Sequence, residues 1–343
     1  ERQLVICSLQ EAQRRAGTDA DAPAVARALR AAGAQAVCIL EVRDGTDWID
    51  TEHARGWLVG ASRPVDAFAQ AMRQALAQGF VAADAAILAK MVQPHELPLL
   101  SWGEELPVRP PCRQRPARRM DLYAIVDSAE RVHRVLAAGV HTVQLRIKRP
   151  AVTDAAWHAM LRDEVWQAID HSASFGAELF INDHWQLAQE LGAPGVHLGQ
   201  EDLLALGDAG RARLLAGGTA LGVSSHSLWE LCRARALSPR YVACGPVWPT
   251  LTKDMPWVPQ GLDNLAWWCR CAGAPVTAIG GILDPREVEA AARTGVDGVC
   301  IVRGLGSDPR ETIPTFKAAL ASGRAQPPVE IPARPHPTLP PAQ

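Results

Sequence analysis

The stretch "ELFINDHWQLAQELGAPGVHLGQ" (residues 178–200) decides the fold. It begins with a short apolar run, "ELFIND", passes through a segment with helical spacing, and ends in a second apolar run, "PGVHLGQ". Short apolar runs of this kind are typical of strands that are buried on both faces of a parallel sheet. The stretch therefore predicts a strand, a helix and a second strand parallel to the first.

The same unit recurs eight times along the C-terminal two thirds of the chain. The apolar runs are "DLYAIVD", "HTVQLRIK", "ELFIND", "PGVHLGQ", "TALGVSSH", "YVACGPVW", "PVTAIGGI" and "DGVCIVRG". Segments with helical spacing separate them, and in "DPREVEAAARTG" a glycine follows the last turn, as expected of a helix C-cap. This alternation predicts an α/β fold, a closed (β/α)8 TIM barrel over residues 120–325, with a doubly wound open sheet as the alternative.

Composition limits the classes of partner. The 343 residues carry a net charge of -2, so no broad basic field favours nucleic acid or an anionic membrane as a partner. No apolar run approaches the roughly 20 residues that span a bilayer, and the first residues lack a signal-peptide pattern. We expect a cytoplasmic protein whose eight scattered cysteines are reduced.

Three further regions are expected outside the barrel. Residues 93–119 are rich in Pro and then Arg and predict a linker, and the Pro-rich residues 326–343 predict a disordered tail. Residues 1–92 predict a separate module: a helix and a buried strand in "AVARALRAAGAQAVCILEV", a hairpin in "DWIDTEHARGWL", and two helices that are broken at Gly79.

Polar side chains gather where the predicted barrel strands end, which is where TIM barrels hold their active sites. Gln144, Arg146 and Lys148 alternate along one strand and so share a face. Asp183 and Asp202 follow two neighbouring strands, and hard carboxylate oxygens of this kind hold Mg²⁺ beside a polyphosphate. Taken without their neighbours, the two aspartates are better explained as helix N-caps.

The loop "CGPVWPTLTKDMPW" (residues 244–257) predicts a phosphate site. Thr250, Thr252 and Lys253 offer two hydroxyls and an ammonium group as hydrogen-bond donors to phosphate oxygens. The backbone amides of Gly280 and Gly281, just before a predicted helix, supply a second cradle for phosphate.

Seven motifs occur in the order and at the barrel positions of thiamine-phosphate synthases, and the resemblance covers about residues 120–323. They are "QLRIK", "FINDHWQLA", "GVHLGQEDL", "LGVSSHS", "CGPVWPTLTK", "AIGGI" and "DGVCIVRG". That family is a group of transferases that join hydroxymethylpyrimidine diphosphate to a thiazole phosphate and release pyrophosphate. The resemblance implies Mg²⁺ as cofactor and a dissociative reaction that needs no protein nucleophile.

The resemblance also implies a role for each site residue. Asp183 and Asp202 would hold Mg²⁺, and the catalytic set would be Arg146, Lys148, Ser224 and Lys253. The residues implied in substrate binding are Gln144, Arg146, Lys148 and Asn182 for the pyrimidine diphosphate, Ser224 and Lys253 for the leaving pyrophosphate, and Thr250, Thr252, Gly280 and Gly281 for the thiazole phosphate. Arg303 stands where many members have Ser and could itself bind that phosphate.

Two histidines and two other functions stay open at this point. We expect His197 to lie inside the barrel rather than act as a base, and the role of His226 is undecided because related thiazole tautomerases use chemistry near this loop. A thiazole tautomerase would not need the aspartate pair or the two lysines Lys148 and Lys253. A non-catalytic ligand-binding regulator would be expected to have lost at least one of the four.

The N-terminal module resembles the C-terminal part of hydroxymethylpyrimidine-phosphate kinases, which have a ribokinase-like fold. Where that family has a G-x-G-D turn that binds phosphate, this chain has Arg63, Pro64, Val65 and Asp66. Pro64 has no amide proton and Val65 resists positive φ, so the cradle cannot form. The resemblance implies a module without kinase activity that serves packing, homo-oligomer formation or docking of a separate kinase, and a barrel that works without residues 1–110 unless the module stabilises it.

Overall fold

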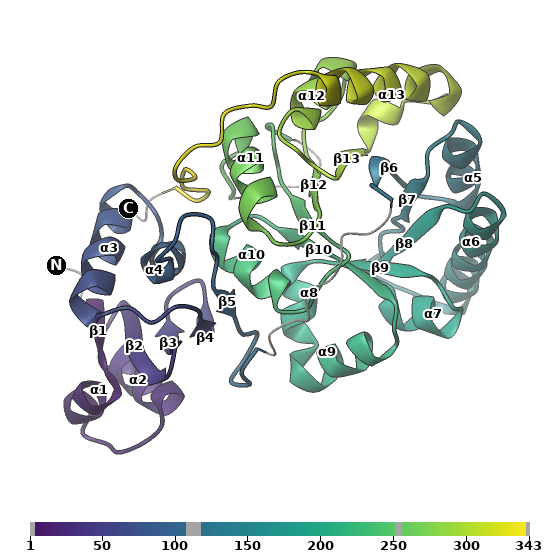
Figure 1. Cartoon of the computed structure of the whole chain (residues 1–343). Helices are drawn as coiled ribbons and strands as arrows, with labels where there is room; N and C mark the ends of the chain where they lie inside the picture. Colours follow the sequence, from purple (N-terminus) through teal and green to yellow (C-terminus); the bar gives the residue numbers. More distant parts are fainter. Residues whose placement is uncertain (1–3, 108–117, 251–255, 341–343) are drawn as a thin grey trace.

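The computed structural model describes residues 4–107, 118–250 and 256–340, which form a small N-terminal module beside a closed barrel (Figure 1). Eight parallel strands close in the order β10-β11-β12-β13-β6-β7-β8-β9, which confirms the predicted TIM barrel. The barrel strands are β6 (Asp121–Val126), β7 (Thr142–Leu145), β8 (Glu178–Asn182), β9 (Gly195–Leu198), β10 (Ala220–Ser225), β11 (Tyr241–Cys244), β12 (Val276–Ala278) and β13 (Gly298–Ile301). Each predicted apolar run contains one of them.

Helices surround the barrel and connect its strands. They are α5 (Ala129–Ala137), α6 (Ala155–Ser174), α7 (Trp185–Glu190), α8 (Gln200–Ala205), α9 (Gly207–Ala216), α10 (Leu228–Arg235), α11 (Gly261–Cys271), α12 (Pro285–Ala292), the short 3-10 helix η1 (Arg303–Leu305) and α13 (Pro309–Ala325). Several begin at a Ser or Asp whose side chain accepts a hydrogen bond from the first turn, as Ser128, Ser227 and Asp284 do. None of the helices within the described ranges has the length and apolarity needed to cross a membrane.

The inside of the barrel is filled by aromatic rings with a buried polar network. Tyr123, Phe180 and Tyr241 pack edge to face, and the hydroxyls of the two tyrosines lie 2.7 Å apart. The amide of Gln144 donates to the Tyr123 hydroxyl at 2.9 Å. These side chains fill the barrel beneath the C-terminal ends of the strands and are called the aromatic floor below. A ligand bound at those strand ends would lie above the aromatic floor.

The N-terminal module is a five-stranded sheet with helices on it. Its elements are β1 (Leu4–Ser8), α1 (Leu9–Ala16), α2 (Ala22–Ala31), β2 (Ala36–Arg43), β3 (Thr46–Asp50), β4 (Arg55–Val59), α3 (Val65–Ala77), α4 (Ala82–Lys90) and β5 (Leu99–Leu100). The strands follow one another in chain order, with β1 and β2 parallel and the later pairs antiparallel. The helix and strand, the hairpin and the helix break at Gly79 (φ 91°) are where the pattern predicts them.

The predicted linker is wrong at its N-terminal end, because β5 lies within residues 93–119 and continues the module's sheet. Leu97, Leu100 and Trp102 are buried, although the prolines around them hide any regular pattern. Two residue pairs in antiparallel register with β4, together with these buried apolar side chains, attach the segment to the sheet. We therefore define the N-terminal module as residues 4–102.

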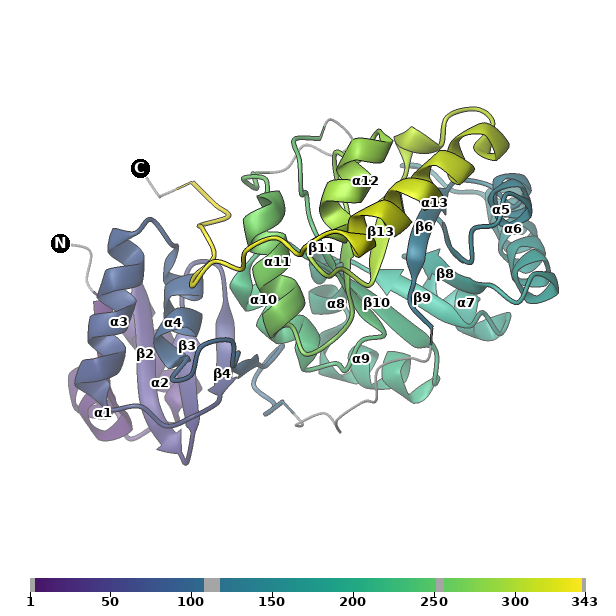
Figure 2. The ribbon, with the colours of Figure 1, turned by 45° about the horizontal axis from the view of Figure 1, so that its top comes forward.

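The predicted disorder of the C-terminal tail is also corrected. Residues 326–340, called the C-terminal strap below, run in extended conformation from α13 past α11 toward the module (Figure 2). Asn264 on α11 exchanges hydrogen bonds with the backbone of His336, and Val258 donates to the Thr338 carbonyl. Proline-rich composition predicted disorder, but extended backbone can still pair with a neighbouring surface.

The module and the barrel share one apolar core. The elements α4 and β5 lie beside α10 (Figure 1), and buried residues of all three belong to a single cluster. The Arg235 guanidinium donates to the carbonyls of Leu97 and Pro98, and the Trp102 indole donates to the Arg233 carbonyl at 2.8 Å. The contact is thus a packed interface and not a loose tether.

Candidate active site

A cavity of about 330 Å³ opens at the C-terminal ends of the barrel strands. Its walls are built at the ends of these strands, and the predicted site residues meet there from seven of the eight. The predicted residues that line it are Arg146, Asn182, Asp183, Asp202, Ser224, Thr250, Gly280, Gly281 and Arg303. Residues from positions 146 to 303 are thus brought into one site by the closure of the barrel.

One wall of the cavity is acidic. Asp183 follows β8 with a left-handed backbone (φ 63°), and Asp202 lies in the first turn of α8, where its carboxylate also accepts the Gly199 amide at 3.2 Å. Desolvation and the neighbouring Asp202 carboxylate raise the pKa of Asp183. Two close carboxylates with this mutual repulsion suit a divalent cation, which would relieve it.

Other residues that line the cavity suit phosphate. Arg146 follows β7 and Arg303 follows β13, so two guanidinium groups line the cavity. Gly280 and Gly281 have φ of 94° and 75°, and a Cβ on Gly281 would lie 2.5 Å from the Trp248 Cβ. Only glycine fits so close to the segment that follows β11, and both glycines line the cavity with their backbone.

Two of the predicted residues that the structure describes do not line the cavity. Gln144 is buried in the barrel interior on Tyr123, and Lys148 is exposed beyond the end of β7. Thr252 and Lys253 lie outside the described residues.

His197 lies inside the barrel, as expected, and connects the aromatic floor to the cavity. Its Nδ1 is 2.7 Å from the Tyr241 hydroxyl and its Nε2 is 2.8 Å from the Ser224 Oγ. Burial, with the positive charge of Arg146, lowers the pKa of His197 to about 4, so the ring is neutral near pH 7. Cys300 also lines the cavity, but burial raises its pKa to about 12, which leaves a protonated thiol and no nucleophile.

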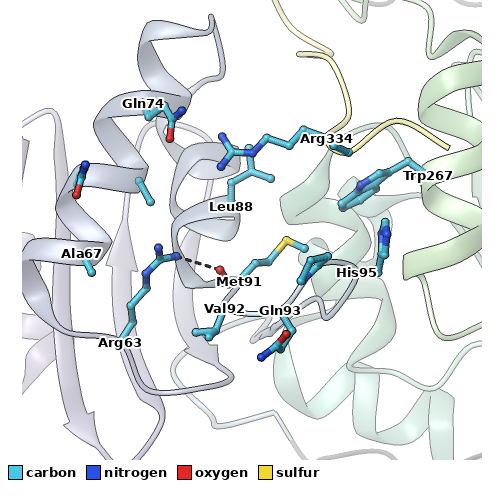
Figure 3. Close-up of a pocket in the computed structure, with 14 residues that line it drawn as sticks. Arg63, Ala67, Gln74, Leu88, Met91, Val92, Gln93, His95, Trp267 and Arg334 are labelled. Atoms are coloured by element: carbon cyan, nitrogen blue, oxygen red, sulfur yellow. Dashed lines mark hydrogen bonds between the residues drawn. The ribbon is translucent and has the colours of Figure 1, made fainter.

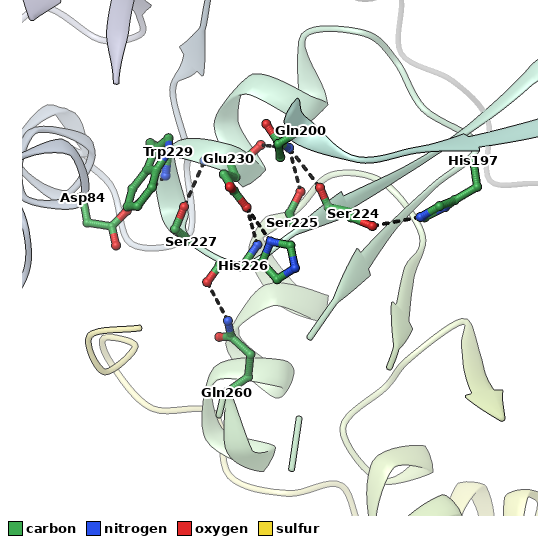
Figure 4. Close-up of polar contacts among 10 residues, drawn as sticks. All are labelled: Asp84, His197, Gln200, Ser224, Ser225, His226, Ser227, Trp229, Glu230 and Gln260. Carbon is green, nitrogen blue, oxygen red and sulfur yellow. Dashed lines mark hydrogen bonds and ion pairs between the residues drawn. The ribbon is translucent and has the colours of Figure 1, made fainter. Parts of the chain in front are cut away.

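Sequence reasoning missed the group around His226. The His226 backbone amide and Nδ1 lie 2.6 and 2.9 Å from one Glu230 carboxylate oxygen (Figure 4). The imidazole stacks on Trp257 with 5.2 Å between the ring centroids. All three side chains line the cavity. The segment "SLWE" from Ser227 has the S-x-x-E pattern of a capping box and could have placed Glu230 in the first turn of α10. Nothing local points to Trp257.

A second cavity, of about 420 Å³, lies where α3 and α4 of the module meet α11 and the C-terminal strap (Figure 3). The Arg63 guanidinium points into it but donates to the carbonyls of Ala89 and Met91, at the C-terminal end of α4. Pro64 directly precedes α3 without a side-chain cap. Arg63 is thus engaged in capping a neighbouring helix.

Known proteins match the barrel. The family described as thiamine monophosphate synthase matches residues 122–305. A thiamine-phosphate synthase from Neisseria meningitidis serogroup A is 42% identical over 203 residues, which cover 58% of this chain and 94% of the relative. One from Rhizobium etli is 42% identical over 212 residues, 60% of this chain and 98% of the relative.

A solved structure matches as well. A thiamine phosphate pyrophosphorylase from Pyrococcus furiosus superposes with a TM-score of 0.51 and 25% identity, over 60% of this chain and 96% of that one. The family match begins at residue 122, so it does not include the N-terminal module.

Proposed function

Because this chain belongs to the thiamine monophosphate synthase family, we propose that it joins hydroxymethylpyrimidine diphosphate to a thiazole phosphate, forming thiamine phosphate and pyrophosphate. The observation that carries the proposal is one cavity lined by the Asp183–Asp202 pair, by Arg146 and Arg303, and by a glycine turn. A diphosphate bound with a divalent cation needs carboxylates for the cation and, in the same cavity, cationic side chains for the phosphate oxygens.

The pair Asp183 and Asp202 would hold Mg²⁺. Among the described residues no third His, Cys, Asp or Glu completes a metal cluster with them. Mg²⁺ often binds through one or two carboxylates and takes its other ligands from water and substrate phosphate, so a two-carboxylate site fits it. When bound, Mg²⁺ would neutralise charge that develops on the departing pyrophosphate.

The chain's own residues would stabilise bond breaking electrostatically. As the pyrophosphate leaves, an electron-rich aminopyrimidine can carry the positive charge on its methylene carbon, and the thiazole nitrogen then attacks that carbon. The Arg146 guanidinium, which lines the cavity, would bind the leaving group together with Lys148 and Lys253. Ser224 would donate its hydroxyl proton to the same group, because neutral His197 can accept from or donate to Ser224 as the ligand requires.

The thiazole phosphate would bind near the ends of β12 and β13. The turn at Gly280 and Gly281 exposes backbone to the cavity, and Arg303 adds a charge that the Ser of other members does not have. Thr250 lines the same wall, with Thr252 proposed beside it. Gln144 and Asn182 are proposed on the pyrimidine side, Gln144 only if the ligand reaches the barrel floor.

The test is a turnover assay on the purified full-length protein. With both substrates and Mg²⁺ we expect thiamine phosphate and one equivalent of pyrophosphate, and we expect neither when a chelator removes the metal. Isomerisation of a thiazole phosphate without coupling would instead identify a tautomerase. Binding of either substrate without any turnover would identify a regulator, and both outcomes would overturn the proposal.

We also propose that the N-terminal module has no kinase activity. Arg63 is committed to the end of α4, and Pro64 replaces an amide donor where a phosphate-binding turn would need one. With ATP, Mg²⁺ and hydroxymethylpyrimidine phosphate, the protein is expected to form no diphosphate. Detectable diphosphate product would contradict this.

A further inference from the structure

The loop that joins β10 to α10 is held at several points around His226. Glu230 binds both the backbone amide and Nδ1 of His226, and the Gln260 side chain donates to the His226 carbonyl at 2.7 Å (Figure 4). The backbone and the ring of His226 are therefore fixed together. Because Glu230 is the third residue of α10, the position of His226 depends on where that helix begins.

The N-terminal module supplies part of the cap of α10. Asp84 on α4 is 2% exposed, and its carboxylate accepts a hydrogen bond from the backbone amide of Trp229 at 3.1 Å. Ser227 accepts the amide of Glu230 at 3.3 Å. The second and third amides of the helix thus have side-chain acceptors, and the acceptor of the second is a carboxylate from the N-terminal module.

A second line of contacts runs from the module to the cavity. The Trp229 ring lies 5.4 Å from the His53 ring of the module and 5.7 Å from Trp257. Trp257 in turn stacks on His226, with an interplanar angle of 9°. The same end of α10 is therefore held by the module through both backbone and side chain.

We propose that Asp84 is a positioning residue of the synthase site, which sets the first turn of α10 and thereby holds His226 and Glu230 at the cavity wall. The inference rests on the proposed function, since it assigns Asp84 a part in turnover. It gives the N-terminal module a catalytic purpose that needs no kinase chemistry. It also predicts that Asp84 acts through His226 and not through general stability alone.

Three variants of the full-length chain test this. Asp84→Ala removes the acceptor, Asp84→Asn keeps a side-chain oxygen, and Asp66→Ala removes an exposed carboxylate from the same module as a matched control. Turnover number and both Michaelis constants are measured at a temperature where circular dichroism shows every variant folded. We expect Asp84→Ala to lower turnover about 10- to 100-fold, as a misplaced site does, and expect Asp84→Asn and Asp66→Ala to stay within about 3-fold of the parent protein.

A double-mutant cycle with His226→Ala separates positioning from general destabilisation. If Asp84 acts through His226, Asp84→Ala adds little to the loss already caused by His226→Ala, whereas independent effects would multiply. If Asp84→Ala does not fold, Asp84→Ser, which keeps a shorter oxygen acceptor, takes its place in the cycle.

Each remaining outcome decides the question. Multiplying effects, an unchanged turnover in Asp84→Ala, or full activity of His226→Ala would each overturn the inference while the parent enzyme stays active. An inactive parent protein would instead count against the proposed function.

Discussion

Asp202 has an observed hydrogen bond and a proposed role as a metal ligand, and one substitution can separate the two. Its carboxylate is a proposed Mg²⁺ ligand and also accepts the Gly199 amide at the start of α8. Asp202→Asn keeps an oxygen for that amide but removes the charge, so we expect a folded protein whose turnover falls on the order of 100-fold. The measurement is turnover at subsaturating Mg²⁺, with Asp163→Asn, an exposed change on α6, as control. Undiminished activity would show that the metal assignment is wrong.

His197 gives the stability a defined pH dependence. Its pKa is lowered to about 4 in the folded protein, while the unfolded side chain titrates near 6.5. Between these values the unfolded state binds a proton that the folded state does not, so stability falls as the pH drops from about 6.5 to 4.

The glutamine in His197→Gln cannot titrate, so this variant should not show the part of the stability loss at low pH that comes from His197. Urea unfolding of both proteins at pH 7.5, 5.5 and 4.5 checks it, and we expect the stability advantage of the parent protein to shrink toward acid. An advantage that is independent of pH would contradict the assignment of a neutral buried His197.

At the scale of elements, a buried ion pair joins α4 to β3. The Lys90 Nζ lies 2.8 Å from the Asp47 Oδ2, and the two side chains are 0% and 2% exposed. Burial raises the pKa of Asp47 and nearby Lys90 opposes that rise. The pair matters for the site because the same helix carries Asp84.

Lys90→Met should lower the free energy of unfolding by about 3–5 kcal/mol, because it leaves the Asp47 carboxylate buried without its partner. Lys90→Met combined with Asp47→Leu should recover much of this, since no charge is then buried. Chemical denaturation measures both, and Arg15→Met, which breaks the exposed pair with Glu11, is a control with little expected effect. An equal loss in the double variant would show that packing, not charge, dominates.

For the whole molecule, the shared core changes what truncation should do. The sequence alone predicts that a protein without residues 1–110 keeps most of its synthase activity, unless the module stabilises the barrel. The structure places buried side chains of α4 and β5 against α10, so the deletion would expose that apolar face and remove the acceptor of the Trp229 amide.

We therefore expect the truncated barrel to be aggregation-prone or to unfold at a lower temperature. Any folded fraction should have lower turnover than the full-length protein. Size-exclusion chromatography, thermal unfolding and activity of the purified fragment are the measurements. A monodisperse fragment with full stability and turnover would show that the interface is dispensable.

The sequence by itself determined the barrel and most of the cavity. Strand and helix periodicities are local, and eight repeats leave few closed arrangements, so residues that end successive strands, such as Asp183, Ser224 and Gly281, had to meet at one mouth. The positive φ of Gly281 is also a local requirement for glycine, whereas its close approach to Trp248 is a tertiary one.

Only the tertiary structure decided what supports that cavity. Asp84 and Trp229 are 145 residues apart in the chain, and His336 reaches Asn264 across 72. Such contacts depend on how whole elements pack, and no periodicity in either segment records its partner. For the same reason the sequence predicts a disordered tail and a linker where the structure has the C-terminal strap and β5. The two segments are ordered by the surfaces they lie on, and their own residues do not record this.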